Sequence, residues 1–199
     1  MNSKDPIVER LLGVACDLFA RQGYAGTSVR EITRRARANL GAVTYHFGSK
    51  AALYHRVIAS RTEPLVARIA EAAAAPGTPL DRIEAIVRTF FDHIATHPEM
   101  PKLILRELTA DRPLPRPAQR AIQQNFGAIA EAVEAGQRDH TIRPGDPLLL
   151  TLSVMAQPFH FAVAARVILA SAGFDFNESN TRRRIIDHVV TTVRRALAA

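Results

Sequence analysis

Residues 22–54 decide the fold, and they read QGYAGTSVREITRRARANLGAVTYHFGSKAALY. The spacing of the apolar residues in this stretch predicts two short helices, at 29–35 and 40–47, with a tight turn between them. Ser28 is placed to cap the first helix, and Glu31 follows three residues later, as a capping box requires. Two short helices joined by a tight turn predict a helix-turn-helix, whose second helix enters the major groove of DNA.

A longer helix is predicted on each side of this motif. The apolar residues of the preceding helix recur in steps of three and four, which gives the helix one buried face. These residues are Ile7, Leu11, Leu12, Ala15, Leu18 and Phe19. Gly23 suits the left-handed position at which a helix ends. After the motif, Ser49 is expected to cap a fourth helix that begins at Lys50, kinks at Pro64 and ends near residue 75.

The rest of the chain is also predicted to be helical. Further amphipathic helices are expected at 80–96, 99–110, 118–138, 148–171 and 181–197. The sequence contains no convincing strand, repeat or low-complexity tract. It therefore predicts an all-α fold of about nine helices, with a small N-terminal head over residues 1–50 and a helical body over residues 51–199.

Positive charge is concentrated at the N-terminal end of the chain. The whole sequence has 26 Lys and Arg against 19 Asp and Glu, a net charge of +7. Residues 1–60 hold nine basic against four acidic residues, whereas residues 61–199 hold seventeen against fifteen. A basic head beside a nearly neutral body indicates a polyanionic partner such as DNA. On charge alone, a basic surface that serves solubility is an equal alternative.

The second short helix carries residue types that suit a DNA-reading surface. A major groove is about 12 Å wide, so residues near base edges must be small or able to hydrogen-bond. Val43 and Phe47, one helical turn apart, are expected to point into the core instead. The candidates for base contacts are Leu40, Gly41, Ala42 and Thr44. The candidates for phosphate contacts are Thr27, Ser28, Tyr45, His46 and Lys50. Arg30, Arg37 and Asn39 complete the set of candidate DNA-binding residues.

The runs TSVREI at 27–32 and VTYHFGSKAALY at 43–54 closely resemble the TetR (tetracycline repressor) family. The specific resemblance covers about residues 7–56, and the all-helical remainder agrees in length. Arg37 departs from the pattern, because the family usually has glycine in this turn. A non-glycine residue in a left-handed turn adds about 1–2 kcal/mol of strain. Segments 39–47 and 97–107 also look like the CecR-type subgroup.

The resemblance implies a ligand-binding and dimerisation domain after the head. It implies a homodimer through the last two helices, a palindromic double-stranded DNA operator, and repression that a small-molecule effector releases. The final helix supports this independently with an apolar stripe, although an internal core helix would show the same pattern. The stripe consists of Ile185, Ile186, Val189, Val190, Val193 and Leu197.

Aromatic, sulfur-bearing and polar residues on the middle helices are the candidates for the ligand pocket. They are Phe90, Phe91, His93, Ile94, Met100, Ile104, Glu107, Phe126, Met155 and Phe159. For each of these residues, a place in the ordinary core is the alternative. His93 and His97 have the i, i+4 spacing of a metal pair, but no third ligand is fixed by spacing, so we expect no metal.

Two other functional classes remain as alternatives. An enzyme is not expected, because the chain has no phosphate-binding glycine loop, nucleophile elbow or metal motif, and no cofactor is expected either. An architectural DNA protein without sequence preference would need basic residues along the whole chain. The single Cys16 excludes an internal disulfide, and we expect neither a signal peptide nor a membrane span. A cytoplasmic protein is therefore expected.

Overall fold

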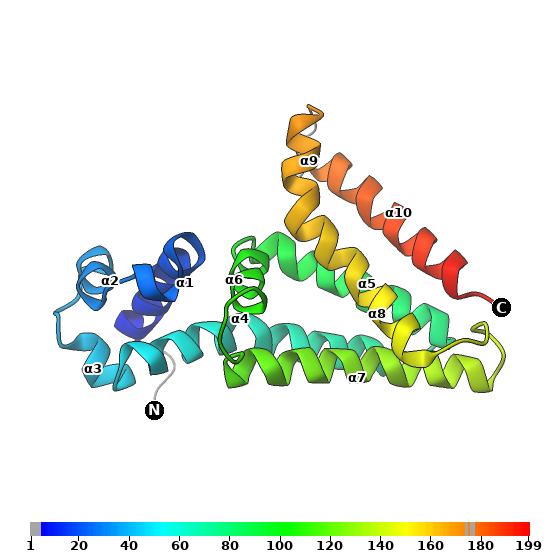
Figure 1. Ribbon diagram of the computed structural model, residues 1–199, viewed down its shortest axis with the longest axis horizontal. Helices are drawn as coiled ribbons and strands as arrows, with labels where there is room; N and C mark the ends of the chain where they lie inside the picture. The colour runs from blue at the N-terminus through cyan, green and yellow to red at the C-terminus, as the bar shows by residue number, and fades with distance from the viewer. Residues whose placement is uncertain (1–4, 174, 176–177) are drawn as a thin grey trace. The chain divides into compact units, whose positions relative to one another are not determined.

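The computed structural model describes residues 5–173, 175 and 178–199 of the chain, and Figure 1 shows its course. Helices make up nearly all of the regular structure in these residues, which contain no strand beyond one isolated bridge between Ile142 and Ala198. The predicted all-α fold is confirmed. Among the described residues, every helix is too short or too polar to span a lipid bilayer.

The chain forms two compact units, and the first consists of residues 1–63 and 102–120. Its helices are α1 (Pro6–Gly26), α2 (Val29–Arg35), α3 (Ala42–Phe47), the start of α4 (Lys50–Ala73) and most of α6 (Met100–Leu108). The first unit therefore extends beyond the predicted head, residues 1–50, and includes residues 102–120, which are distant in sequence. By packing, these residues belong with the helix-turn-helix.

The second unit consists of residues 64–101 and 121–199. It contains the remainder of α4, α5 (Pro79–Thr96), most of α7 (Arg116–Arg138), α8 (Pro147–His160), α9 (Arg166–Ser171) and α10 (Ser179–Leu197). The single helix predicted at 148–171 is divided, because a π-helical stretch, Phe161–Ala165, separates α8 from α9. This stretch follows Pro158, which lacks the N–H that an α-helix needs at that position.

The core of the first unit explains why the helix-turn-helix forms. Leu11 and Phe19 of α1, Ile32 of α2 and Leu53 of α4 are completely buried, and Val43 of α3 is 1% exposed. Leu11, Phe19 and Val43 lie on the helix faces that the sequence pattern predicted to be buried. Together they hold α3 with its opposite face exposed.

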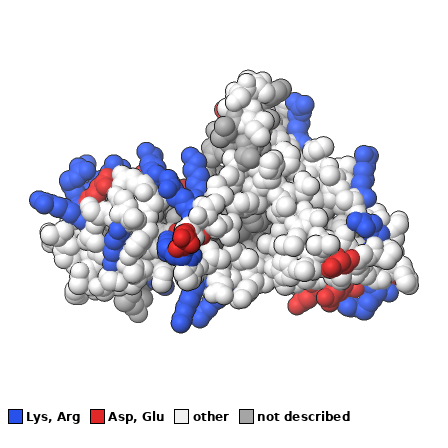
Figure 2. Space-filling model, in the orientation of Figure 1, with Lys and Arg blue, Asp and Glu red and all other residues white. Residues whose placement is uncertain are grey.

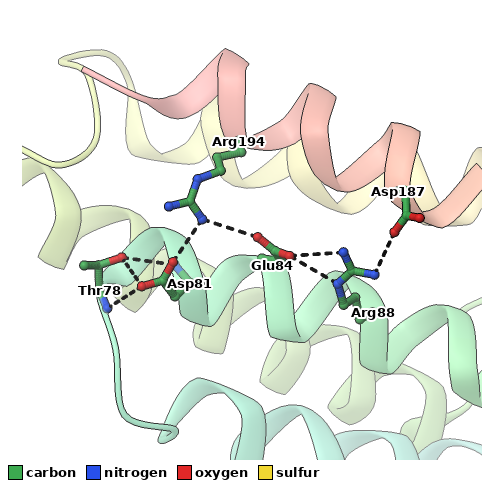
Figure 3. Close-up of polar contacts among 6 residues, drawn as sticks. All are labelled: Thr78, Asp81, Glu84, Arg88, Asp187 and Arg194. Carbon is green, nitrogen blue, oxygen red and sulfur yellow. Dashed lines mark hydrogen bonds and ion pairs between the residues drawn. The ribbon is translucent and has the colours of Figure 1, made fainter.

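The core of the second unit joins α5, α8 and α10, which pack against one another (Figure 1). Thr78 and Asp81 form a complete capping box at the start of α5. Figure 3 shows that this box continues into an ion-pair network between α5 and α10. Arg194 lies 2.9 Å from Asp81 and 3.3 Å from Glu84. Arg88 connects Glu84 with Asp187, at 3.2 and 3.1 Å.

This network links the exposed sides of α5 and α10. It joins α10 to α5 at Asp187 and Arg194, while Val189 and Val193 of the same helix are buried in the core. Hydrogen bonds from Thr78 and Arg194, together with the Arg194 charge, hold the pKa of Asp81 at about 2, well below its ordinary value. The outward face of α10 is thereby defined by its attachment to α5.

Gly136 of α7 gives a direct test of packing in the second unit. The N–H of Ile142 donates to the Gly136 carbonyl at 2.9 Å, and a Cβ at Gly136 would meet the buried Ile142 side chain at 2.5 Å. Gly136→Ala is therefore expected to destabilise the fold by about 1–3 kcal/mol. Gly127→Ala in the same helix has open space and should stabilise it by about 0.5–1 kcal/mol. Urea unfolding measures both, and equal effects would contradict this packing.

Candidate nucleic-acid interface

Helix α3 presents the exposed face that the sequence predicted. Val43 and Phe47 are buried, whereas Tyr45 is 85% exposed and Leu40, just before the helix, is 61% exposed. Gly41 and Thr44 are exposed as well. A Cβ at Gly41 would meet no atom of the described residues within 4 Å, so none of these neighbours requires a glycine there. The small residue leaves room for an external surface to approach the backbone.

The turn before α3 adopts the left-handed conformation that the sequence predicted at Arg37. Its φ is +51°, its N–H donates to the Arg34 carbonyl at 3.2 Å, and the N–H of Ala38 donates to the Thr33 carbonyl at 2.9 Å. This pair of hydrogen bonds is a Schellman motif, which ends α2. The Arg10 side chain also donates to the Ala36 carbonyl, at 3.3 Å, and ties the turn to α1.

Replacing Arg37 separates the strain of this turn from the charge of its side chain. Arg37→Gly is expected to stabilise the fold by up to about 1 kcal/mol, because glycine adopts a positive φ without steric cost. Arg37→Ala keeps the strained backbone conformation and should not stabilise the fold. Both variants should bind DNA more weakly, with a salt slope lower by about 0.9. Urea unfolding and salt titrations measure these effects, and equal stability of the two variants would argue against strain at this position.

The candidate phosphate-binding residues differ in their surroundings. Ser28 is exposed and caps α2 by accepting from the Glu31 N–H at 3.1 Å, as predicted. Glu31 does not complete the capping box, because its carboxylate pairs with Arg35 at 3.2 Å. Thr27 is 1% exposed, and its hydroxyl donates to the Gly23 carbonyl at 2.8 Å. The Thr27 hydroxyl therefore supports the end of α1 and does not lie on the surface that the prediction assigned to it.

Lys50 begins α4, where Ser49 accepts from the Ala52 N–H at 3.1 Å, consistent with the predicted cap. The Lys50 ammonium lies 4.3 Å from the centre of the Tyr24 ring, a cation–π contact. Partial burial lowers the pKa of Lys50 from its ordinary value. Of the other candidates, Arg30 and Asn39 are exposed, while Ala42 and His46 are half-buried.

The positive charge of the chain lies in the unit that carries the helix-turn-helix. The first unit has fifteen Lys and Arg against seven Asp and Glu, a balance of +8. The second unit has eleven against twelve, a balance of −1. Figure 2 shows Lys and Arg side chains gathered over the helices of the first unit. Five of these basic residues lie at 102–120, and their place in the first unit could not be predicted because they are separated from the motif along the chain.

The predicted pocket residues fall in both units. Ile104 and Glu107 lie in the first unit, and the other eight lie in the second. Phe91, His93, Ile94 and Met100 are buried, whereas Phe90, Phe126, Met155 and Phe159 are half-buried. A cavity of about 110 Å³ lies between α8 and α10, and none of the ten predicted residues lines it. Its lining includes Leu150, Val154, Gln157 and Val193.

The two histidines considered as a metal pair face one another. The rings of His93 and His97 are stacked with centres 4.3 Å apart and planes 20° apart. Nδ1 of His97 lies 2.9 Å from the Thr96 hydroxyl and 3.3 Å from the His93 carbonyl, so it already has hydrogen-bond partners. The described residues contain no group of three His, Cys, Asp or Glu able to hold a metal.

Comparison with known proteins agrees with this geometry. Residues 11–57 match the family described as bacterial regulatory proteins, tetR family, and residues 79–193 match a tetracyclin repressor-like C-terminal domain. The chain is 32% identical over 165 residues to the HTH-type transcriptional repressor SCO4008 of Streptomyces coelicolor, covering 78% of this chain and 80% of the relative. It is 26% identical over 192 residues to RutR of Escherichia coli, covering 90% and 88%.

Solved structures share the fold over nearly the whole chain. The ketosteroid transcriptional regulator KstR2 of Mycobacterium tuberculosis superposes with a TM-score of 0.80 at 19% identity, covering all of this chain and 97% of KstR2. A bacterial regulatory protein of the tetR family from Rhodococcus RHA1 gives 0.80 at 17% identity, covering 100% and 99%.

A basic helix-turn-helix unit followed by a helical body defines a DNA-binding transcriptional regulator. The matched models cover both parts, and the chain belongs to the TetR family. It is therefore a regulator and not an enzyme, as the sequence predicted. The resemblance to the CecR-type subgroup stays a prediction.

Proposed function

We propose that this regulator is a repressor that binds a palindromic operator as a homodimer and leaves it when a small-molecule effector binds. The proposal follows the predicted division, with residues 1–50 reading DNA and residues 51–199 binding effector and partner. A bacterial operator lies in the cytoplasm, so the protein acts there. The observation that carries the proposal is the exposed face of α3 within a unit of net charge +8.

In this proposal, α3 of each subunit enters a major groove. Leu40, Gly41, Ala42 and Thr44 approach base edges, because they are small or can hydrogen-bond. The phosphate backbone is contacted by the remaining exposed or half-buried candidates. These are Ser28, Arg30, Arg37, Asn39, Tyr45, His46 and Lys50. In a dimer, the two reading helices then fall about 34–36 Å apart, one turn of DNA.

The proposed dimer interface consists of α8 and α10. Leu148, Leu149 and Leu152 of α8 are 53%, 58% and 47% exposed. Three large apolar residues exposed within five positions form a patch that a monomer in water would leave uncovered. The ion pairs to α5 hold α10 by one face and leave its outward face available. A second copy of the chain would cover both helices by two-fold symmetry.

The proposed effector site lies in the second unit, among the eight predicted pocket residues that this unit contains. Asn125 Oδ1 of α7 and Thr151 Oγ1 of α8 are buried side-chain atoms of the second unit, and neither has a hydrogen-bond partner in the described part of the chain. Buried polar atoms are normally hydrogen-bonded, so these two atoms support the proposal that a ligand with hydrogen-bond donors binds nearby. Release of DNA requires the effector to bind the DNA-free form of the protein more tightly than the DNA-bound form. The coupling free energy between effector binding and DNA binding is typically about 1–3 kcal/mol.

Selection from a library of random DNA duplexes tests the central part of this proposal. The full-length protein should enrich a palindromic consensus at a salt concentration where binding is detectable. Enrichment of a sequence that is not palindromic would contradict the proposal that the protein binds DNA as a symmetric homodimer. Equal affinity for every sequence would instead support an architectural DNA protein and overturn the repressor proposal.

A further inference from the structure

Within the first unit, side-chain hydrogen bonds connect helix α6 with the end of α1. The backbone of α1 is kinked at Gly23, whose φ of +76° and ψ of 172° are not helical. Such a kink leaves carbonyls of the preceding turn without their helical donors. Arg106 of α6 occupies this position, because its guanidinium donates to the carbonyls of Ala20 and Arg21, at 3.1 and 2.8 Å. Charge-assisted hydrogen bonds of this kind are among the stronger ones in proteins.

The next residue of α6, Glu107, is a buried carboxylate shared by two partners. It is 4% exposed, and its Oε1 accepts from the Tyr54 hydroxyl of α4 and from Arg112 at 2.7 Å. Its other oxygen, Oε2, has no hydrogen-bond partner among the residues that the structure describes. A buried carboxylate with so few partners is strongly dependent on each of them. Glu107 thereby connects three segments: α4, α6 and the loop after α6.

Aromatic contacts continue from Tyr54 to Lys50. The Tyr54 ring packs edge-on against Phe19 at 4.7 Å and lies 5.0 Å from Tyr24, measured between ring centres. The Lys50 ammonium lies over Tyr24, and the Arg112 guanidinium lies 5.7 Å from the centres of both tyrosine rings. Two cations therefore share one aromatic surface, and one of them, Arg112, also forms an ion pair with Glu107.

We propose that Glu107 is a positioning residue for DNA binding, which acts through Arg112, Tyr54 and Tyr24 to hold the Lys50 ammonium at the start of α4. This inference rests on the proposed DNA contact of Lys50. Glu107 draws Arg112 toward itself and fixes the Tyr54 hydroxyl, so that the Tyr24 face stays available to Lys50. Without the carboxylate charge, Arg112 competes with Lys50 for the same ring, and the ammonium loses its fixed place.

Glu107→Gln in the full-length protein tests this role, because the simplest electrostatic expectation has the opposite sign. Removal of an acidic charge from a basic DNA-binding unit should strengthen binding to a polyanion. We expect weaker binding instead, by about three- to tenfold for operator and random duplexes alike, with a lower salt slope. In a Lys50→Ala background, the same substitution should change affinity by less than about twofold, since both act on one contact.

Asp111→Asn is the matched control, because it removes the same charge four residues away at an exposed position. Its affinity for DNA should be unchanged or slightly higher. Equal or tighter binding by Glu107→Gln, or a full effect that persists in the Lys50→Ala background, overturns the proposal.

An NMR measurement without DNA separates this inference from the proposed function. Protons of the Lys50 side chain over the Tyr24 face should resonate upfield, and Glu107→Gln should move them toward ordinary values. Tyr54→Phe, which removes only the hydroxyl, is a second variant with a smaller shift in the same direction. Unchanged Lys50 resonances in both variants overturn the positioning role, even if the protein reads DNA as proposed. Shifted resonances in a protein that binds no DNA would support the contact and reject the proposed function.

Discussion

Leu152→Asp is expected to produce a monomer that binds its operator more weakly by about 100-fold or more. Leu152 is 47% exposed on α8, beside Leu148 and Leu149, in the proposed dimer interface. A carboxylate there would be buried without a partner on association, which costs several kcal/mol. A monomer also loses the second half-site, and with it the gain in affinity from two linked contacts. Sedimentation analysis measures the oligomeric state, and gel-shift titration measures the affinity.

Leu108→Asp is the control for the effect of the substitution itself. Leu108 is 49% exposed, close to the value of Leu152, but it lies on α6 in the first unit. This variant should remain a dimer. A Leu152→Asp protein that stays dimeric at micromolar concentration would place the interface on another surface.

Local features of this fold could be predicted from the sequence because their causes lie within a few residues. Gly23 and Arg37 both have the positive φ that the sequence predicted at these positions. Ser28 caps α2, and Val43 points into the core, since each depends on helix geometry over a single turn. The bounds of α2 and α5 agree with the predicted helices to within one residue.

Features that depend on distant partners could not be predicted in the same way. The sequence predicts that Glu107 lines a pocket, whereas its carboxylate accepts a hydrogen bond from Tyr54, 53 positions earlier in the chain. Thr27 looked like a phosphate ligand at a helix start, yet the kink at Gly23 provides a carbonyl that its hydroxyl reaches first. The division of 148–171 by a π-helical stretch depends on how the backbone accommodates Pro158. The spacing of apolar residues along the chain carries no information about these contacts or about the path of the backbone at Pro158.

Lys50→Ala and Thr44→Ala are expected to weaken DNA binding in different ways. Lys50 carries a full charge at the start of α4, so its loss should lower affinity about tenfold for operator and random duplexes alike and reduce the salt slope by about 0.9. Thr44 is an uncharged, exposed residue of α3. Its truncation should cost about 1 kcal/mol on the operator, change the preferred base at one position in each half-site and leave the salt slope unchanged.

The ratio of operator to random affinity separates the two roles. That ratio should stay constant in Lys50→Ala and fall in Thr44→Ala, because phosphate contacts carry no sequence information and base contacts do. Salt titrations of both variants on both duplexes provide the measurement. An unchanged salt slope in Lys50→Ala would remove Lys50 from the phosphate-binding residues, and the aromatic contact with Tyr24 would then serve only the packing of α4 against α1.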